Sequence, residues 1–219
     1  MNLSEELIEL KQVYFPEEIF PKDYFVPIKS PIPTEYFFPL GEGIYEKGKW
    51  KVHDHYPIMV VAEDCGEEEA YLSQWSKIRM SPKFTKELGE RESNEYWNKL
   101  LLLLGEETMK DCFFSHFIMG LRKENSNQSA HSFLYTAEGQ SFLKANEKFF
   151  MAQLELLEPD VIIALGINQP KFLAGCFPKQ LKALSTVDSL EKFVNVCPKG
   201  FMEIFHDGHP LRIVFIPEP

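Results

Sequence analysis

The chain is poor in cysteine and in positive charge, and it lacks long apolar runs. Its four cysteines have no CxxC spacing, which argues against a zinc ribbon or a cysteine-held iron–sulfur cluster and suits a reducing compartment. Only 23 lysines and arginines face 33 acidic residues, so the net charge of −10 opposes strong non-specific binding to a phosphate backbone. No apolar run approaches the ~18 residues that span a bilayer, and the first residues are acidic where a signal peptide is basic. We therefore expect a cytoplasmic protein with no membrane partner.

Apolar runs of strand length are present, and they predict an α/β fold. The 219 residues are 44% apolar and include 19 phenylalanines, which is enough for a full core. Runs typical of buried strands begin at Ile58, Cys112 and Val161, about fifty residues apart, and helix-like sequence follows each of them. Leu211–Ile216 is a fourth run, and the Asp-Gly pair before it predicts a hairpin. We expect three α/β/α layers around a central, mostly parallel four-stranded sheet.

Two parts of the chain differ in composition. Six prolines lie among aromatic residues between Phe15 and Pro39, which disfavours regular helix and central strands. We therefore expect residues 1–40 to form an arm packed on a single domain of residues 41–219. Within that domain, apolar spacing predicts a long helix over 139–158, whereas the polar residues 124–132 predict a surface loop.

Two carboxylates follow the first predicted strand. The run Ile58-Met-Val-Val-Ala is followed by Glu63, Asp64, Cys65 and Gly66. In open α/β sheets, ligands bind just beyond the carboxyl ends of the strands, which is where Glu63 and Asp64 are expected. The alternative interpretation is structural, with Asp64 capping a helix and Glu67 completing a capping box.

Histidines occur in two close pairs, His53 with His55 and His206 with His209. Such pairs could hold a metal, but the first pair lacks a third ligand nearby, and the two pairs lie far apart in the chain. We expect a solvated loop for His53 and His55, with no metal and no cofactor.

The order of the segments resembles that of the uracil-DNA glycosylase superfamily. Val60-Val-Ala-Glu-Asp-Cys-Gly66 is similar to the first motif of that family, and Phe113-Phe-Ser-His-Phe-Ile-Met-Gly-Leu-Arg122 is similar to its second strand. Val161–Gly166 matches a strand ending in Leu-Gly, and Phe215–Pro219 falls where His-Pro-Ser is expected. The resemblance covers residues 38–219. It implies hydrolysis of the bond between sugar and base in single- or double-stranded DNA, after the base is flipped out of the stack.

The resemblance also implies catalytic roles for particular residues. Asp64 would direct the water, with Glu63 where glutamine is common. His116 replaces an asparagine that reads the base, and an imidazole can make only one of the two contacts an amide makes. Glu218 stands where a histidine would donate to the leaving base, and a carboxylate there opposes the developing negative charge. The alternative counterpart of that histidine is His209.

The same resemblance indicates a base-binding set. It comprises Phe114 or Phe133 as stacking partner, together with His116, Cys65 and Gly66. Altered motifs and the acidic surface also favour a second hypothesis, in which a non-catalytic relative binds nucleic acid, a nucleotide or a protein. The third hypothesis is a nucleoside hydrolase that uses Asp64 and Glu218 as a carboxylate pair. In each case we expect a monomer.

Overall fold

Buried β-branched and aromatic runs form the centre of the molecule, a five-stranded sheet. The computed structural model describes residues 3–27, 45–46, 49–50, 55–69, 102–105, 107–108, 111–123 and 127–216. The sheet has the order β5-β4-β7-β9-β8. Its strands are β4 (Ile58–Asp64), β5 (Cys112–Ile118), β7 (Val161–Leu165), β8 (Phe201–His206) and β9 (His209–Ile216).

Four of these strands are parallel, which confirms the mixed α/β class and the mostly parallel sheet. The predicted count of four strands is wrong, because β8 pairs antiparallel with β9 and adds a fifth strand at the edge. The Asp-Gly hairpin is confirmed. Asp207 and Gly208 both have positive φ, 49° and 85°, as the twist of a two-residue hairpin requires.

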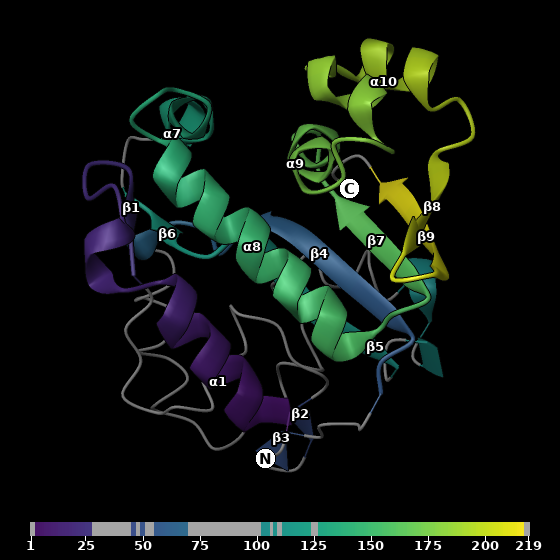
Figure 1. Ribbon diagram of the computed structural model, residues 1–219, viewed down its shortest axis with the longest axis horizontal. Helices are drawn as coiled ribbons and strands as arrows, with labels where there is room; N and C mark the ends of the chain where they lie inside the picture. Colours follow the sequence, from purple (N-terminus) through teal and green to yellow (C-terminus); the bar gives the residue numbers. More distant parts are fainter. Residues whose placement is uncertain are drawn as a thin grey trace.

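Two short ladders accompany the main sheet. Strand β1 (Phe25–Val26) pairs antiparallel with β6 (Leu121–Arg122), and β2 (Tyr45–Glu46) pairs with β3 (Lys49–Trp50). The β1–β6 ladder lies near the carboxyl end of β4 (Figure 1).

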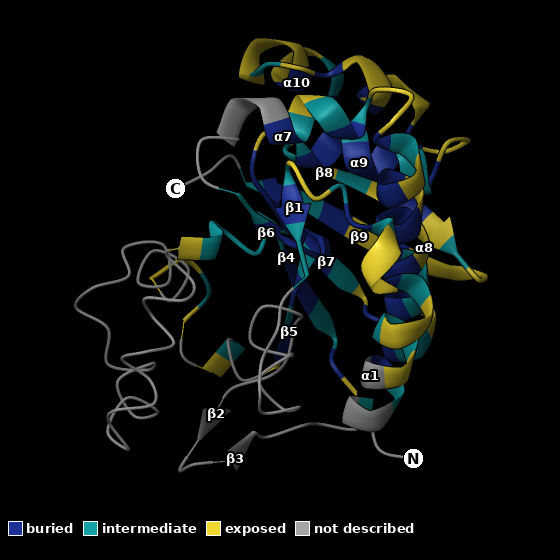
Figure 2. Cartoon of the chain, turned by 90° about the vertical axis from the view of Figure 1, so that its left-hand side faces the viewer, coloured by how far each residue is buried: buried dark blue, intermediate teal, exposed yellow. Residues whose placement is uncertain are grey.

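One long helix covers one face of the sheet. Helix α8 (Gln140–Leu157) confirms the helix predicted over 139–158, and its axis follows nearly the same line as β4 in Figure 1. Its apolar side is buried against the sheet, with Phe150 contacting Phe117 of β5. Figure 2 shows this buried side of α8 and its exposed outer side.

In the described part of the chain, four shorter α-helices accompany α8. They are α1 (Leu3–Tyr14), α7 (Asn127–Leu134), α9 (Gln169–Cys176) and α10 (Leu190–Val196). Three of them, α1, α7 and α9, pack against α8. Two 3-10 turns cover Glu17–Ile19 and Lys182–Thr186. The surface loop predicted over 124–132 is wrong from residue 127 onward, because Ala130 and Leu134 are buried one helical turn apart and give α7 an apolar side.

The segment after α1 packs through its phenylalanines. Phe15, Phe20 and Phe25 are buried, and all three rings contact Phe142 of α8. The opposite face of the sheet is also apolar, with Val60 and Ile163 buried there. Within the described residues, no helix is both long enough and apolar enough to cross a membrane.

Candidate functional site

The end of strand β4 places two carboxylates at the carboxyl edge of the sheet. Asp64 is the last residue of the strand and pairs in register with Ile118 of β5. The chain then turns at Gly66, which has a φ of 85° that favours glycine. The Gly66 backbone N–H donates to Asp64 Oδ1 at 2.8 Å, so the turn fixes the orientation of the carboxylate.

Arg122 reaches the same carboxylate from strand β6. Its Nε lies 2.8 Å from Asp64 Oδ2, and its backbone N–H donates to the Gly66 carbonyl at 2.8 Å. The Arg122 side chain is 21% exposed and that of Asp64 only 7%. This ion pair is therefore largely removed from water, where charge pairing is least screened.

His131 brings helix α7 to the two carboxylates. Its Nε2 lies 2.9 Å from Asp64 Oδ2, and its Nδ1 lies 3.7 Å from Glu63 Oε1. One imidazole thus faces both acidic side chains of the β4 end. We define Glu63, Asp64, Arg122 and His131 as the edge cluster.

The edge cluster shifts the pKa values of its members in opposite directions. Burial alone would raise the pKa of Asp64, but the hydrogen bond with His131 and the Arg122 charge hold it below its ordinary value. Burial alone would lower the pKa of His131, but the hydrogen bond with Asp64 and the charges of Glu63 and Asp64 raise it above its ordinary value. The cluster therefore favours the ionised form of Asp64 and the protonated form of His131.

Glu63 faces the neighbouring strand end. A Cβ atom added at Gly166, directly after β7, would lie 3.7 Å from Glu63 Oε2, so the glycine leaves room beside this carboxylate. Tyr135 lies nearby, and burial and the charges of Glu147 and Glu63 raise its pKa. Lys171 of α9 sits over the Tyr135 ring, 3.6 Å from its centroid.

The cluster supplies two chemical capacities. Asp64 accepts two hydrogen bonds, from Gly66 and His131, and forms an ion pair with Arg122, so a carboxylate with about four lone-pair positions keeps room for a water. Glu63, with 19% of its side chain exposed, is a second and less constrained acceptor. The protonated His131 is a proton donor beside both, and carboxylate and imidazolium together are the groups of general acid–base catalysis.

The other expected base-binding residues lie in varied surroundings. His116 is on β5 beside Ala62, two residues before the pair Asp64–Ile118. Phe114 packs against the apolar cluster on the face opposite α8. Cys65 directs its thiol to the Ile118 carbonyl at 3.6 Å, and burial raises its pKa, so the thiol takes part in packing. Phe133 stacks on Tyr24, with ring centroids 4.1 Å apart.

The structure does not bring His209 to the edge cluster. Strand β9 runs parallel to β4 and begins at His209, so this residue lies at the amino edge of the sheet, whereas Asp64 lies at the carboxyl edge. His209 is therefore not placed to act as the histidine that donates to the leaving base, and this expectation is wrong. Glu218 and His53 lie outside the described residues. In the described part of the chain, no three His, Cys, Asp or Glu side chains are arranged to hold a metal ion.

Sequence reasoning assigned no role to Arg122 or His131. Arg122 appeared only as the last residue of a motif, and His131 lay in a segment interpreted as a loop. The spacing of Ala130, Phe133 and Leu134, at i, i+3 and i+4, was the signal that could have predicted α7 and with it the position of His131. No protein-family model matches this chain, and a search of curated proteins finds no significant match.

Proposed function

We propose that the chain is a uracil-DNA glycosylase-like hydrolase that cleaves the N-glycosidic bond of a damaged or deaminated base in DNA. The observation that carries this proposal is the contact between His131 Nε2 and Asp64 Oδ2, 2.9 Å, with Glu63 on the other side of the imidazole. Breaking this bond needs an anionic group that holds water near a cationic sugar and a donor for the departing base. The edge cluster contains both kinds of group.

Each residue has a role in this proposal. Asp64 and Glu63 hold the attacking water and accept the proton it loses as its oxygen bonds to the sugar carbon, and their charges stabilise the sugar as it becomes cationic. His131 donates toward the leaving base, which supplies the function that a carboxylate at position 218 would oppose. Arg122 keeps Asp64 ionised and oriented, since it lowers the pKa of that carboxyl group.

The sheet supports a further part of the proposal, the three-layer α/β/α arrangement. Helix α8 covers one face, and on the other face Val60, Cys112, Ile163 and Leu165 are buried as a second apolar cluster. Leu104 packs against that cluster. Buried apolar residues on both faces are typical of parallel sheets with helices on each side.

The test is excision of one base from an end-labelled single-stranded oligonucleotide, followed by alkaline cleavage of the abasic site. Oligonucleotides bearing one uracil or one hypoxanthine are compared at low salt, because the chain has a net charge of −10. Asp64→Asn, Glu63→Gln and His131→Gln are each expected to lower the single-turnover rate by about 10²–10⁴. Glu203→Gln, which alters an exposed carboxylate paired with Arg212, is the matched control and is expected to retain the full rate.

Ligand binding without catalysis is the second candidate function. The observation that favours it is the number of partners of Asp64, since the hydrogen bonds with Gly66 and His131 and the ion pair with Arg122 leave this carboxylate little capacity for a reaction. In that case no oligonucleotide is cleaved, and fluorescence anisotropy detects binding that survives Asp64→Asn. Release of free base from deoxyuridine, with no action on DNA, would instead support the nucleoside hydrolase.

A further inference from the structure

Asn146 is a fully buried polar residue in an apolar layer. It lies on α8 between Phe142 and Phe149, and its exposed fraction is 0%. A buried amide is costly unless its polar atoms are hydrogen-bonded. Asn146 Nδ2 donates to the Phe142 carbonyl at 2.7 Å, and Oδ1 accepts from the Met119 backbone N–H at 2.6 Å.

Met119 begins the turn that delivers Arg122 to Asp64. The next residue, Gly120, is tightly enclosed, since an added Cβ would lie 3.2 Å from the Phe20 ring and 3.4 Å from the Val26 carbonyl. Leu121 then pairs with Val26, and Arg122 follows with its two contacts to the β4 end. We define residues 119–122 as the arginine turn.

We infer that Asn146 is a positioning residue, which sets the contact between Arg122 and Asp64 by holding the first backbone N–H of the arginine turn. Only Gly120 and Leu121 separate Met119 from Arg122, and Gly120 is closely enclosed on the side where a Cβ would lie. A shift of Met119 is therefore transmitted to the guanidinium. The effect on catalysis rests on the proposed function, whereas the effect on Arg122 does not.

Helix α8 offers a matched control in Gln153. This residue is also 0% exposed, and its Oε1 accepts from the Ser115 hydroxyl at 2.7 Å. Ser115 lies within β5, before the arginine turn. Asn146→Leu and Gln153→Met thus each remove one buried amide from the same side of one helix, but only the first releases the turn.

The experiment follows the side-chain Nε–H of Arg122 by NMR in the whole chain, with the signal assigned by its absence in Arg122→Lys. Asn146→Leu is expected to speed exchange of this hydrogen with solvent by about tenfold or more, since losing a buried hydrogen bond opens the structure it supported. Gln153→Met is expected to leave the rate within about twofold of the wild type. Unchanged exchange in folded Asn146→Leu overturns the inference, as does equal acceleration in both variants.

The titration of His131 provides a second readout that a general loss of stability does not produce. Glu63, Asp64 and Arg122 face its imidazole; burial lowers the pKa of His131, and of these three charges Arg122 also lowers it. Withdrawal of Arg122 in Asn146→Leu is therefore expected to raise the pKa of His131, and a lower or unchanged value contradicts the inference. If Asn146→Leu does not fold, Asn146→Ser decides, because its shorter side chain also removes the amide oxygen that accepts from the Met119 N–H. Faster exchange at Arg122 then supports the inference, and unchanged exchange overturns it.

Discussion

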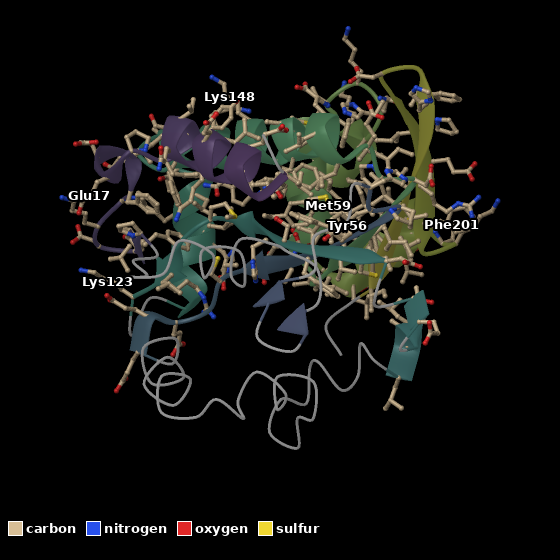
Figure 3. All side chains as sticks on the ribbon, turned by 90° about the horizontal axis from the view of Figure 1, so that it is seen from below. Glu17, Tyr56, Met59, Lys123, Lys148 and Phe201 are labelled. Carbon is tan, nitrogen blue, oxygen red and sulfur yellow. The ribbon has the colours of Figure 1, made fainter. Side chains whose placement is uncertain are left out.

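Two arginine–carboxylate pairs occupy distant parts of this molecule. Arg122 Nε and Asp64 Oδ2 lie 2.8 Å apart, and an Arg212 guanidinium nitrogen and Glu203 Oε1 lie 2.6 Å apart. Figure 3 shows the separation, with Lys123, next to Arg122, at one end and Phe201, at the start of β8, toward the other. The contact distances alone do not distinguish the two pairs.

Burial and additional partners do distinguish them. Asp64 and Arg122 have 7% and 21% of their side chains exposed, whereas Glu203 and Arg212 have 59% and 54%. Asp64 also receives hydrogen bonds from Gly66 and His131. Exposed pairs contribute little to stability, whereas removing one partner of a buried pair leaves a charge without compensation. The buried Asp64–Arg122 pair, in which each charge would be costly without its partner, is therefore the candidate for function. The exposed Glu203–Arg212 pair is not.

The largest effect is expected from Arg122→Met. This change removes the guanidinium while keeping an apolar side chain of similar length, and Asp64 then remains buried with less compensation. We expect the free energy of unfolding to fall by about 3–5 kcal/mol, measured by urea denaturation at pH 7.

Arg212→Met is the matched control for that measurement. If both variants lose a similar amount of stability, the difference drawn between the two pairs is wrong. The double variant Arg122→Met with Asp64→Asn tests the cause, because neutralising Asp64 is expected to recover part of the loss.

Much of the fold followed from local sequence patterns. Runs such as Val161–Leu165 are buried on both faces of the sheet, so their apolar residues are continuous and easily recognised. Helix α8 has an apolar side over five turns, and Pro159 marks its end. The Asp-Gly hairpin predicts Phe201–His206 as a strand, but the count of four left it out of the sheet; its exposed residues alternate with partly or fully buried ones, as in an edge strand.

The edge cluster could be predicted only in part. Glu63 and Asp64 follow directly from the end of a recognisable strand. His131 reaches them from 67 residues further along the chain, and no local pattern encodes such a contact. Arg122 is positioned by the arginine turn and by Asn146 of another helix, so its role depends on tertiary packing.

A smaller effect is expected from His131→Gln, and it should depend on pH. The pKa of His131 is raised in the folded protein, so its contribution is complete below the unfolded value of about 6.5 and is lost as pH rises through the folded value. We expect a loss of about 1–3 kcal/mol at pH 6 that shrinks steadily above it, measured by urea denaturation at several pH values. The difference between wild type and variant removes the contribution of titrating groups that His131 does not contact. A difference that grows with pH would contradict the assigned direction.

Stability at low pH tests Asp64, the partner of His131 in the same contact. The pKa of Asp64 is lowered in the folded protein, so its contribution is complete above the unfolded value of about 3.9 and is lost as pH falls through the folded value. Wild type should therefore lose stability on acidification faster than Asp64→Asn does. Parallel curves for the two proteins below about pH 4 would show that Asp64 does not titrate as the cluster requires.

The smallest effect is expected at the exposed pair. Arg212→Met should change the free energy of unfolding by less than about 1 kcal/mol, because water and salt screen the pair and its side chains lose entropy in forming it. Arg212 also lies over the Phe201 ring, 5.4 Å from its centroid, and the methionine side chain can still pack on that ring. Repeating the urea measurement at high salt sharpens the comparison. Salt should abolish most of the small loss in Arg212→Met while leaving most of the loss in Arg122→Met, because the buried pair is shielded from ions by the protein around it. An equal salt effect on both variants would mean that solvent reaches Asp64 as freely as it reaches Glu203.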